Sequence, residues 1–161
     1  MIGKSEVVRW IIIMLAVLLL TAAAGEGIAG SDIGKLKGQT VYVPVYSHIY
    51  SGSREQQFKL AVTLSIRNTD PNHAITIAAV DYFNSSGNLV DKYLQKAETL
   101  PQMASIRYVV KESDKKGGSG ANFIVAWSAA EAVNPPIIET VMIGTQAQQG
   151  ISFTSRGQAI E

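Results

Sequence analysis

Residues 58–90 read FKLAVTLSIRNTDPNHAITIAAVDYFNSSGNLV, and this stretch decides the fold. In its first part every second residue is large and apolar, with smaller or polar residues between them. This alternation places all the large side chains on one face of a β-strand, whereas a helix would scatter them around its circumference. We therefore predict a strand from Phe58 to Arg67. Its inward residues are Phe58, Leu60, Val62, Leu64 and Ile66.

The second part of the stretch predicts a further strand from Ile75 to Phe83. The turn-forming residues 68–73, NTDPNH, separate it from the first strand. Its apolar positions change parity, because Ile75 and Ile77 are odd and Val80 and Tyr82 are even. A β-bulge near residues 78–79 would return the later side chains to the same face. Burial on both faces of the strand is the alternative.

Similar patterns extend over the rest of the chain. We expect a strand over Gln39–Tyr50, at a sheet edge or with a bulge because Pro44 lacks an N–H group. Residues 98–102 read as a connection, 129–132 could form one helical turn, 145–150 read as a loop and 156–161 as a polar tail. Further strands are expected at Leu89–Leu94, at Ser105–Lys111, around Phe123, Val125 and Trp127, at Ile137–Ile143, and at Ile151 and Phe153.

This spacing of about eight strands predicts an all-β fold. We expect an immunoglobulin- or fibronectin-like antiparallel β-sandwich of about eight strands, with a barrel as the alternative. The predicted domain comprises residues 39–161, preceded by a flexible tether at 25–38 that is rich in glycine and serine.

The N-terminus has the residue pattern of an export signal. Lys4 and Arg9 are followed by 15 apolar or small residues, Trp10 to Ala24, which end in Ala22-Ala23-Ala24. This arrangement is typical of a signal peptide at residues 1–24, and an uncleaved signal anchor is the alternative. The protein is therefore expected to be periplasmic or extracellular. It would contact a membrane only through residues 7–24, as an inner-membrane anchor, if these are retained.

Charge and cysteine content exclude several function classes. Loss of residues 1–24 removes Lys4, Arg9 and Glu6, so the basic residues fall from 14 to 12 and the acidic residues from 13 to 12. A net charge of zero argues against nucleic acid or an anionic membrane surface as the partner, because both attract a basic field. The chain has no cysteine, which excludes disulfides, thiolate metal sites and thiol nucleophiles.

An aromatic strip is the first candidate contact surface. Tyr42, Tyr46, His48 and Tyr50 share one parity of the first predicted strand. On an edge strand such a strip could bind a partner or a glycan, or it could pack beneath a loop.

Two loops supply the other candidate contacts. Asp70 and His73 share the turn at 68–73, where Asp70 is expected to stabilise the turn and His73 to face solvent. A metal site that also uses His48, Met103 or Met142 is the alternative, because the soft sulfur of methionine suits Cu(I). The loop at 112–122 is polar and rich in glycine, and its candidates are Lys115, Lys116, Ser119 and Asn122. Its backbone N–H groups could cradle an anion, but Ser119 lacks the glycine pattern of a nucleophile elbow. No catalytic residue, metal site or cofactor is predicted.

Four longer segments resemble a known family: GQTVYVPVYSHIY, LAVTLSIRNTDPNHAITIAAVDYFNSSGNLV, GGSGANFIVAW and IIETVMIGTQAQQGISFTSRG. They are similar to a bacterial family catalogued as domain of unknown function 3124, over Gly38 to about Ile160. The resemblance implies a bacterial, exported domain and supplies no catalytic residues.

The sequence therefore favours a non-enzymatic interaction or accessory module of the cell envelope, with an envelope protein as its possible partner. An exported protein that binds a small ligand or a metal is the alternative.

Overall fold

The computed structural model describes Met14 and residues 34–51, 55–146 and 149–161. The chain divides into two compact units, Met1–Asp32 and Ile33–Glu161, and all the strands belong to the second unit. Apart from Met14, the predicted signal segment at 1–24 lies outside the described residues, as does most of the predicted tether. No described helix is both long and apolar enough to cross a membrane.

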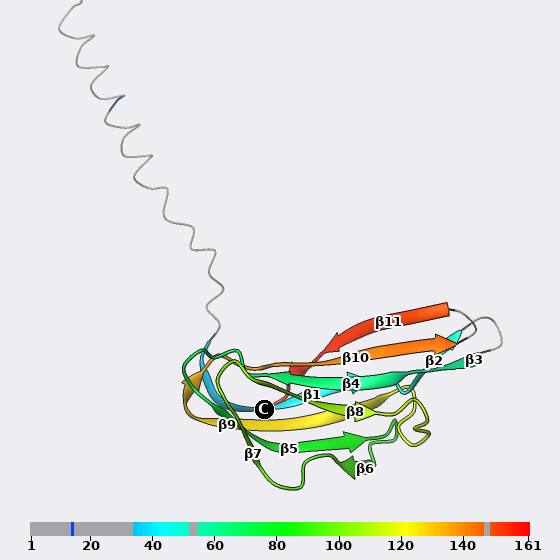
Figure 1. Cartoon of the computed structure of the whole chain (residues 1–161), viewed down its shortest axis with the longest axis horizontal. Helices are drawn as coiled ribbons and strands as arrows, with labels where there is room; N and C mark the ends of the chain where they lie inside the picture. The colour runs from blue at the N-terminus through cyan, green and yellow to red at the C-terminus, as the bar shows by residue number, and fades with distance from the viewer. Residues whose placement is uncertain (1–13, 15–33, 52–54, 147–148) are drawn as a thin grey trace, which may run out of the picture. The chain divides into compact units, whose positions relative to one another are not determined.

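The described part of the second unit consists of strands joined by turns (Figure 1). The first six strands are β1 (Leu36–Val45), β2 (His48–Ser51), β3 (Gln56–Lys59), β4 (Ala61–Arg67), β5 (Ile75–Phe83) and β6 (Leu89–Lys92). The other six are β7 (Glu98–Leu100), β8 (Ser105–Val110), β9 (Ala121–Val133), β10 (Ile137–Gln146), β11 (Gln149–Arg156) and β12 (Gln158–Ala159).

These strands form two main sheets, and every strand pair is antiparallel. The six-stranded sheet has the order β12-β1-β9-β5-β6, with β7 also paired to β5. The four-stranded sheet has the order β11-β10-β4-β8, and β2 and β3 form a small sheet of their own. The all-β, antiparallel prediction is confirmed, with a sandwich-like arrangement of the two sheets (Figure 1).

One hydrophobic core lies between the sheets. The six-stranded sheet contributes Val43, Val125 and Phe123, and the four-stranded sheet contributes Leu64 and Met142, all with 0% exposure. Trp127 belongs to the same core. The sheets are joined at one edge, where the Thr140 hydroxyl of β10 donates a 2.7 Å hydrogen bond to the Pro44 carbonyl of β1.

The alternation in the deciding stretch is confirmed, but the predicted single strand is wrong. All five predicted inward side chains are buried, from Phe58 at 7% to Ile66 at 0%. The strand is interrupted at Leu60, where the chain leaves the small sheet as β3 and enters the four-stranded sheet as β4. Because β3 and β4 bury the same parity, the alternation continues through this change of sheet.

The predicted bulge in β5 is confirmed. The register between β5 and β9 shifts between Ile77 and Ala79, so that both Ile77 and Val80 are fully buried. The possible helical turn at 129–132 is wrong, because β9 continues as a strand to Val133. Pairing with β1 extends this far, since Leu36 lies opposite Val133.

Four other segments differ from the sequence-based expectation. The first strand begins at Leu36 and ends at Val45, so residues 36–38 are strand and the predicted Gln39–Tyr50 strand is divided into β1 and β2. The expected connection at 98–102 contains β7, and the expected loop at 145–150 belongs largely to the β10–β11 hairpin. The expected tail contains β12, which pairs Val41 and Tyr42 of β1. Since β12 is so short, Pro44 lies on a part of β1 with a neighbour on one side only.

Candidate functional site

The Asp70 side chain links its own turn, residues 68–73, to the β9–β10 loop through hydrogen bonds. Asp70 is 1% exposed, and its Oδ1 accepts hydrogen bonds from the backbone N–H groups of Asn72 and His73, both at 2.9 Å. Its Oδ2 accepts a 3.2 Å bond from the backbone N–H of Asn134, which belongs to the β9–β10 loop. The His73 ring lies with Nδ1 3.1 Å from Asp70 Oδ1, and its side chain is 43% exposed. The arrangement fits the predicted turn.

Replacing Asp70 with asparagine is expected to reduce the dependence of stability on acidic pH. Hydrogen bonds from the N–H groups of Asn72, Asn134 and His73 lower the pKa of Asp70 from 3.8 to about 2, against the opposing effect of burial. The folded-state pKa is the lower one, so the carboxylate stabilises the fold above pH 3.8 and this contribution is lost as the pH falls through about 2. Urea unfolding between pH 2 and pH 6 should show that Asp70→Asn is less stable than the parent protein at pH 6. This difference in the free energy of unfolding should narrow toward pH 2.

The exposed Asp91 provides the control for this prediction, because Asp91→Asn removes the same charge from a position without such a set of backbone donors. If the difference in the free energy of unfolding between Asp70→Asn and the parent protein is constant across the pH range, the Asp70 carboxylate does not stabilise the turn as proposed.

The glycine-rich loop is also held by side chains. Asp114 Oδ2 accepts bonds from the Tyr82 hydroxyl at 3.0 Å and from the Gly117 N–H at 3.1 Å. Burial raises the pKa of Tyr82, and the Asp114 carboxylate adds to this shift, so the hydroxyl remains a donor. Ser47 Oγ accepts a 2.9 Å bond from the N–H of Gly118, and Gly118 has a φ of +89°. These hydrogen bonds hold the glycine-rich loop in its observed conformation.

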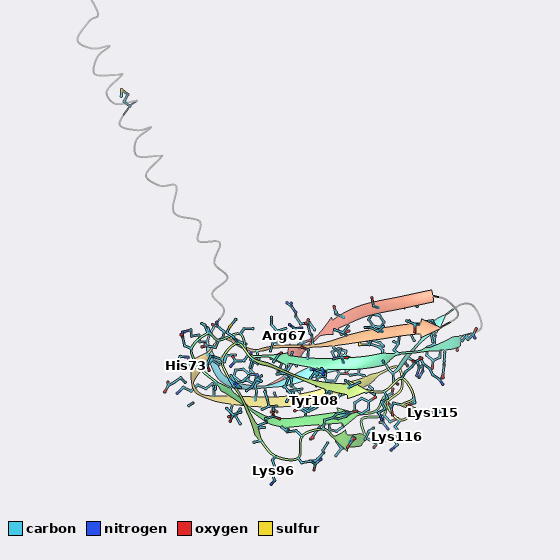
Figure 2. The ribbon with its side chains drawn as sticks, in the orientation of Figure 1. Arg67, His73, Lys96, Tyr108, Lys115 and Lys116 are labelled. Carbon is cyan, nitrogen blue, oxygen red and sulfur yellow. The ribbon has the colours of Figure 1, made fainter. Side chains whose placement is uncertain are left out.

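The remaining candidates of this loop are dispersed. Lys115 and Lys116 are exposed, Ser119 is partly buried, and Asn122 lies within β9 opposite Pro44 of β1. Figure 2 shows Lys115 and Lys116 at one end of the strands and His73 at the other. The two predicted contact loops therefore do not form one site.

The predicted aromatic strip is divided by the break between β1 and β2. Tyr46 lies in this break, partly buried, with its ring 5.7 Å from that of Phe153. His48 and Tyr50 contact each other edge to face at 5.2 Å, and Tyr50 is 54% exposed. Tyr42 lies apart from them on β1, 36% exposed. The predicted strip is thus divided into the His48–Tyr50 pair and two separate rings, Tyr42 and Tyr46.

The described residues include no group of three or more histidine and carboxylate side chains placed to hold a metal ion. Met142, a possible soft ligand, is fully buried in the core, and Met103 is 69% exposed.

The sequence-based search missed the outer face of the four-stranded sheet. Side chains here point away from the core and no other described element pairs over them. Val109 and Ile143 are about half exposed, at 49% and 50%, and Ile137 is 36% exposed. The outer face consists of Thr63, Ser65 and Arg67 on β4, Ser105, Arg107 and Val109 on β8, Ile137, Glu139, Val141 and Ile143 on β10, and Ser152, Thr154 and Arg156 on β11.

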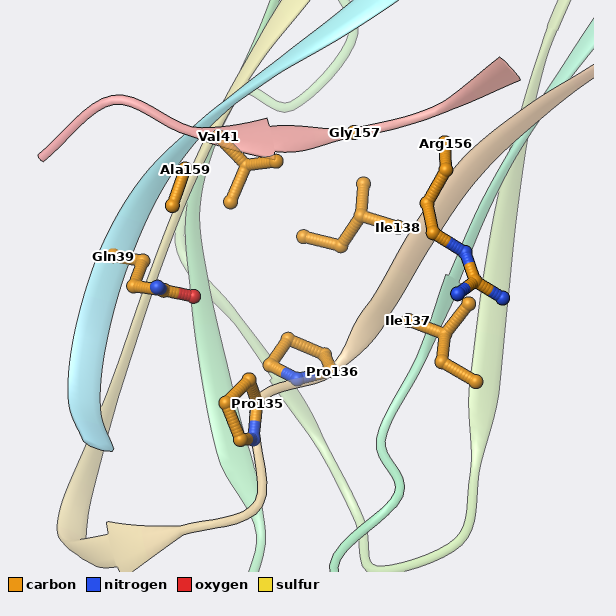
Figure 3. Close-up of a pocket in the computed structure, with 9 residues that line it drawn as sticks. All are labelled: Gln39, Val41, Pro135, Pro136, Ile137, Ile138, Arg156, Gly157 and Ala159. Atoms are coloured by element: carbon orange, nitrogen blue, oxygen red, sulfur yellow. The ribbon is translucent and has the colours of Figure 1, made fainter. Parts of the chain in front are cut away.

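Two cavities lie on or beside this face. An open hollow of about 320 Å³ is lined by the hydroxyl residues Thr63 and Ser65, by Arg67 and Arg107, and by Val141. A smaller cavity of about 230 Å³ lies where the chain passes from β11 to β12 (Figure 3). Figure 3 shows Gln39 and Arg156 on opposite sides of it, with Pro135 and Pro136 below.

Comparison with protein families gives one assignment. The sequence model of the family described as "Protein of unknown function (DUF3124)" matches residues 38–160. The chain belongs to this family. The DUF3124 match spans the whole set of strands from β1 to β12, apart from the first two residues of β1.

Other comparisons add little to the DUF3124 assignment. No curated protein matches the chain. One similar solved structure, from Thermotoga maritima, is described as "Crystal Structure of Thermotoga maritima 1070". It is 10% identical, with a TM-score of 0.46, and the alignment covers 74% of this chain and 92% of the other.

Proposed function

We propose that this DUF3124 protein is a non-enzymatic interaction or accessory module of the bacterial cell envelope, which binds a partner protein through the outer face. The observation that carries the proposal is the exposure of Val109 and Ile143, each about half accessible, on an open sheet face. Val109 lies across Thr63 of β4 from Val141, and Ile143 follows Val141 on the same face of β10, so the aliphatic side chains are neighbours on the sheet. Contiguous exposed apolar surface marks interaction sites. Arginine is enriched at protein interfaces, and Arg67, Arg107 and Arg156 lie on the same face.

The sequence supports the envelope location and the finer fold assignment. The apolar segment from Trp10 to Ala24 behind Lys4 and Arg9 favours export, to the periplasm or beyond, or anchoring in the inner membrane. We further propose that the sandwich is of the immunoglobulin or fibronectin type, because its two antiparallel sheets enclose one core.

The two histidines of the chain each contact a neighbouring side chain. His48 lies against Tyr50, with 3.3 Å between His48 Nε2 and the Tyr50 hydroxyl oxygen. His73 lies against Asp70 within its turn. Neither histidine forms a hydrogen bond to Ser119 among the described residues.

Site-specific photo-cross-linking in the producing cells tests the proposal. A photoreactive amino acid would replace Val109 or Ile143 on the outer face, and Tyr42 on the six-stranded sheet as the matched exposed control. We expect one recurrent protein cross-linked from Val109 and Ile143 and not from Tyr42. Equal cross-linking from Tyr42, or none from the outer face, would contradict the proposed surface.

Binding of a small ligand is the second candidate function, and the cavity in Figure 3 favours it. Its volume of about 230 Å³ is below the roughly 300–1,000 Å³ of most ligand sites, so only a small molecule would fit. Native mass spectrometry of the purified protein would detect such a ligand. The bound mass should be lost on Arg156→Gln if the cavity holds it.

A further inference from the structure

Strand β8 has an open edge with a defined hydrogen-bonding pattern. It is the last strand of the four-stranded sheet and pairs only with β4 in the described structure. The Asn68 N–H donates a 2.9 Å bond to the Ala104 carbonyl just beyond the ends of this pair. Because hydrogen-bonded pairs alternate along an antiparallel ladder, the backbone groups of Ile106, Tyr108 and Val110 face β4. Those of Ser105, Arg107 and Val109 therefore face the open edge.

The same three residues of β8 carry outward side chains. In the register of the sheet, Ser65 of β4 lies opposite Arg107 of β8, and Arg67 of β4 lies opposite Ser105 of β8. The four residues thus form a square on the outer face, with the two arginines on one diagonal and the two serines on the other. Both pairs are of the non-hydrogen-bonded type, in which opposite side chains are closest.

The two arginines of this square have no acidic partner among the described residues. Arg67 Nε donates a 3.1 Å hydrogen bond to Ser65 Oγ, and neither Arg67 nor Arg107 forms an ion pair in the described part of the chain. Glu139 of β10 lies across from Arg156 of β11 on one side and from Ser65 of β4 on the other, and it forms no ion pair with Arg67, Arg107 or Arg156 among the described residues. The open hollow of about 320 Å³ lies between Arg67 and Arg107. Arg67, at the end of β4 in the four-stranded sheet, is labelled in Figure 2.

Protection of the edge against accidental pairing does not explain this arrangement. A single charged side chain on an edge strand, here Arg107, serves that purpose. Arg67 lies on β4, one strand further into the sheet, where it cannot guard the edge. Two guanidinium groups about a pair of hydroxyls instead match a carboxylate, which accepts paired hydrogen bonds from arginine.

We propose that an extended acidic segment of a partner protein adds to the sheet along β8, with an aspartate or glutamate side chain between Arg107 and Arg67. The inference rests on the proposed function and names the chemistry of the partner. A residue opposite Arg107 on an added antiparallel strand would exchange backbone hydrogen bonds with it and point its side chain to the outer face. The carboxylate would then reach the Arg107 guanidinium from the neighbouring strand and enter the hollow beside Arg67.

Binding of a synthetic peptide to the purified full-length protein tests the proposal. The probe is a short fluorescent peptide that alternates threonine and glutamate, measured by fluorescence anisotropy. Arg107→Gln should weaken binding by roughly tenfold or more, because a charge-assisted hydrogen bond is lost. Arg67→Gln should weaken it in the same direction, whereas Lys92→Gln removes the same charge from β6 of the six-stranded sheet and should leave binding unchanged. All three side chains are exposed, so the variants should retain the fold, which circular dichroism would verify.

Two altered peptides distinguish the contribution of the peptide's negative charge from that of its backbone hydrogen bonds. Glutamine in place of glutamate should abolish binding, and N-methylation of alternate backbone amides should also abolish it while keeping the charge. Unchanged binding of the N-methylated peptide would overturn strand addition. An equal effect of Lys92→Gln and Arg107→Gln, or binding of inorganic phosphate at the two arginines without binding of the peptide, would overturn the acidic-segment proposal. If no acidic peptide binds but Val109 and Ile143 still cross-link to one protein, the partner chemistry is wrong and the interaction surface stands.

Discussion

Replacing Phe123 with alanine is expected to lower the free energy of unfolding by about 3–5 kcal/mol. Phe123 has 0% exposure on β9, between β1 and β5. Its ring centroid lies 5.1 Å from that of Tyr82 and 5.3 Å from that of Tyr93, so the cavity left by the substitution would be lined by other rings. Those rings cannot easily collapse into it, since Tyr82 is held by its hydrogen bond to Asp114. Urea unfolding followed by circular dichroism would measure the loss.

The adjacent Ile124 provides the matched control for this prediction. It lies on the same strand with its side chain on the opposite face, where it is partly exposed. Ile124→Ala should therefore cost only about 1 kcal/mol, the span of strand propensities. Similar losses for Phe123→Ala and Ile124→Ala would show that the core does not depend on this ring.

Local periodicity explains why the inward residues could be predicted from the sequence. The alternation in β4 and β9 requires only that one face be buried, and Leu64 and Val125 are indeed fully buried. The bulge in β5 was predictable for the same reason, because Ile77 and Val80 cannot share a face without an extra residue between them.

Pairing between distant strands explains why β7, β12 and the break at Leu60 could not be predicted from the sequence. The short strands β7 and β12 have no pattern of their own, and they exist because β5 and β1 offer free edges to them. The change of sheet at Leu60 leaves the alternation intact, so no periodic signal marks it.

The candidate site residues also depend on contacts between segments that are distant in the sequence. Asp70 and Asp114 were visible as residue types, but the donors that surround them come partly from other loops, as with Asn134. Arg67 and Arg107 were recognisable as outward residues of two strands. Only the register between β4 and β8 brings them to one square, and register depends on pairing that sequence periodicity does not specify.

Replacing Gly144 with alanine is expected to lower the free energy of unfolding by about 1–3 kcal/mol, through overpacking at the break between β3 and β4. An added Cβ would lie 2.5 Å from Phe58 Cε1, 2.6 Å from the Lys59 carbonyl oxygen and 2.9 Å from Leu60 Cδ2. The flexible end of a side chain could move aside, but the Lys59 carbonyl is backbone. That backbone is fixed on its other side, because the Leu60 N–H donates a 3.0 Å hydrogen bond to the Ser47 carbonyl.

Gly150 is the matched control, since it lies on β11 in the same hairpin as Gly144 and a Cβ there would meet no atom within 4 Å. Gly150→Ala should be neutral or slightly stabilising, because alanine restricts the unfolded chain more than glycine does. The comparison therefore separates the close approach at Gly144 from the general effect of a glycine substitution in a strand. If both variants unfold at the same urea concentration as the parent protein, Gly144 is not required for the passage of the chain from the small sheet to the four-stranded sheet. A loss confined to Gly144→Ala would show that this passage depends on a backbone contact with β10, which the alternation of residues 58–66 does not encode.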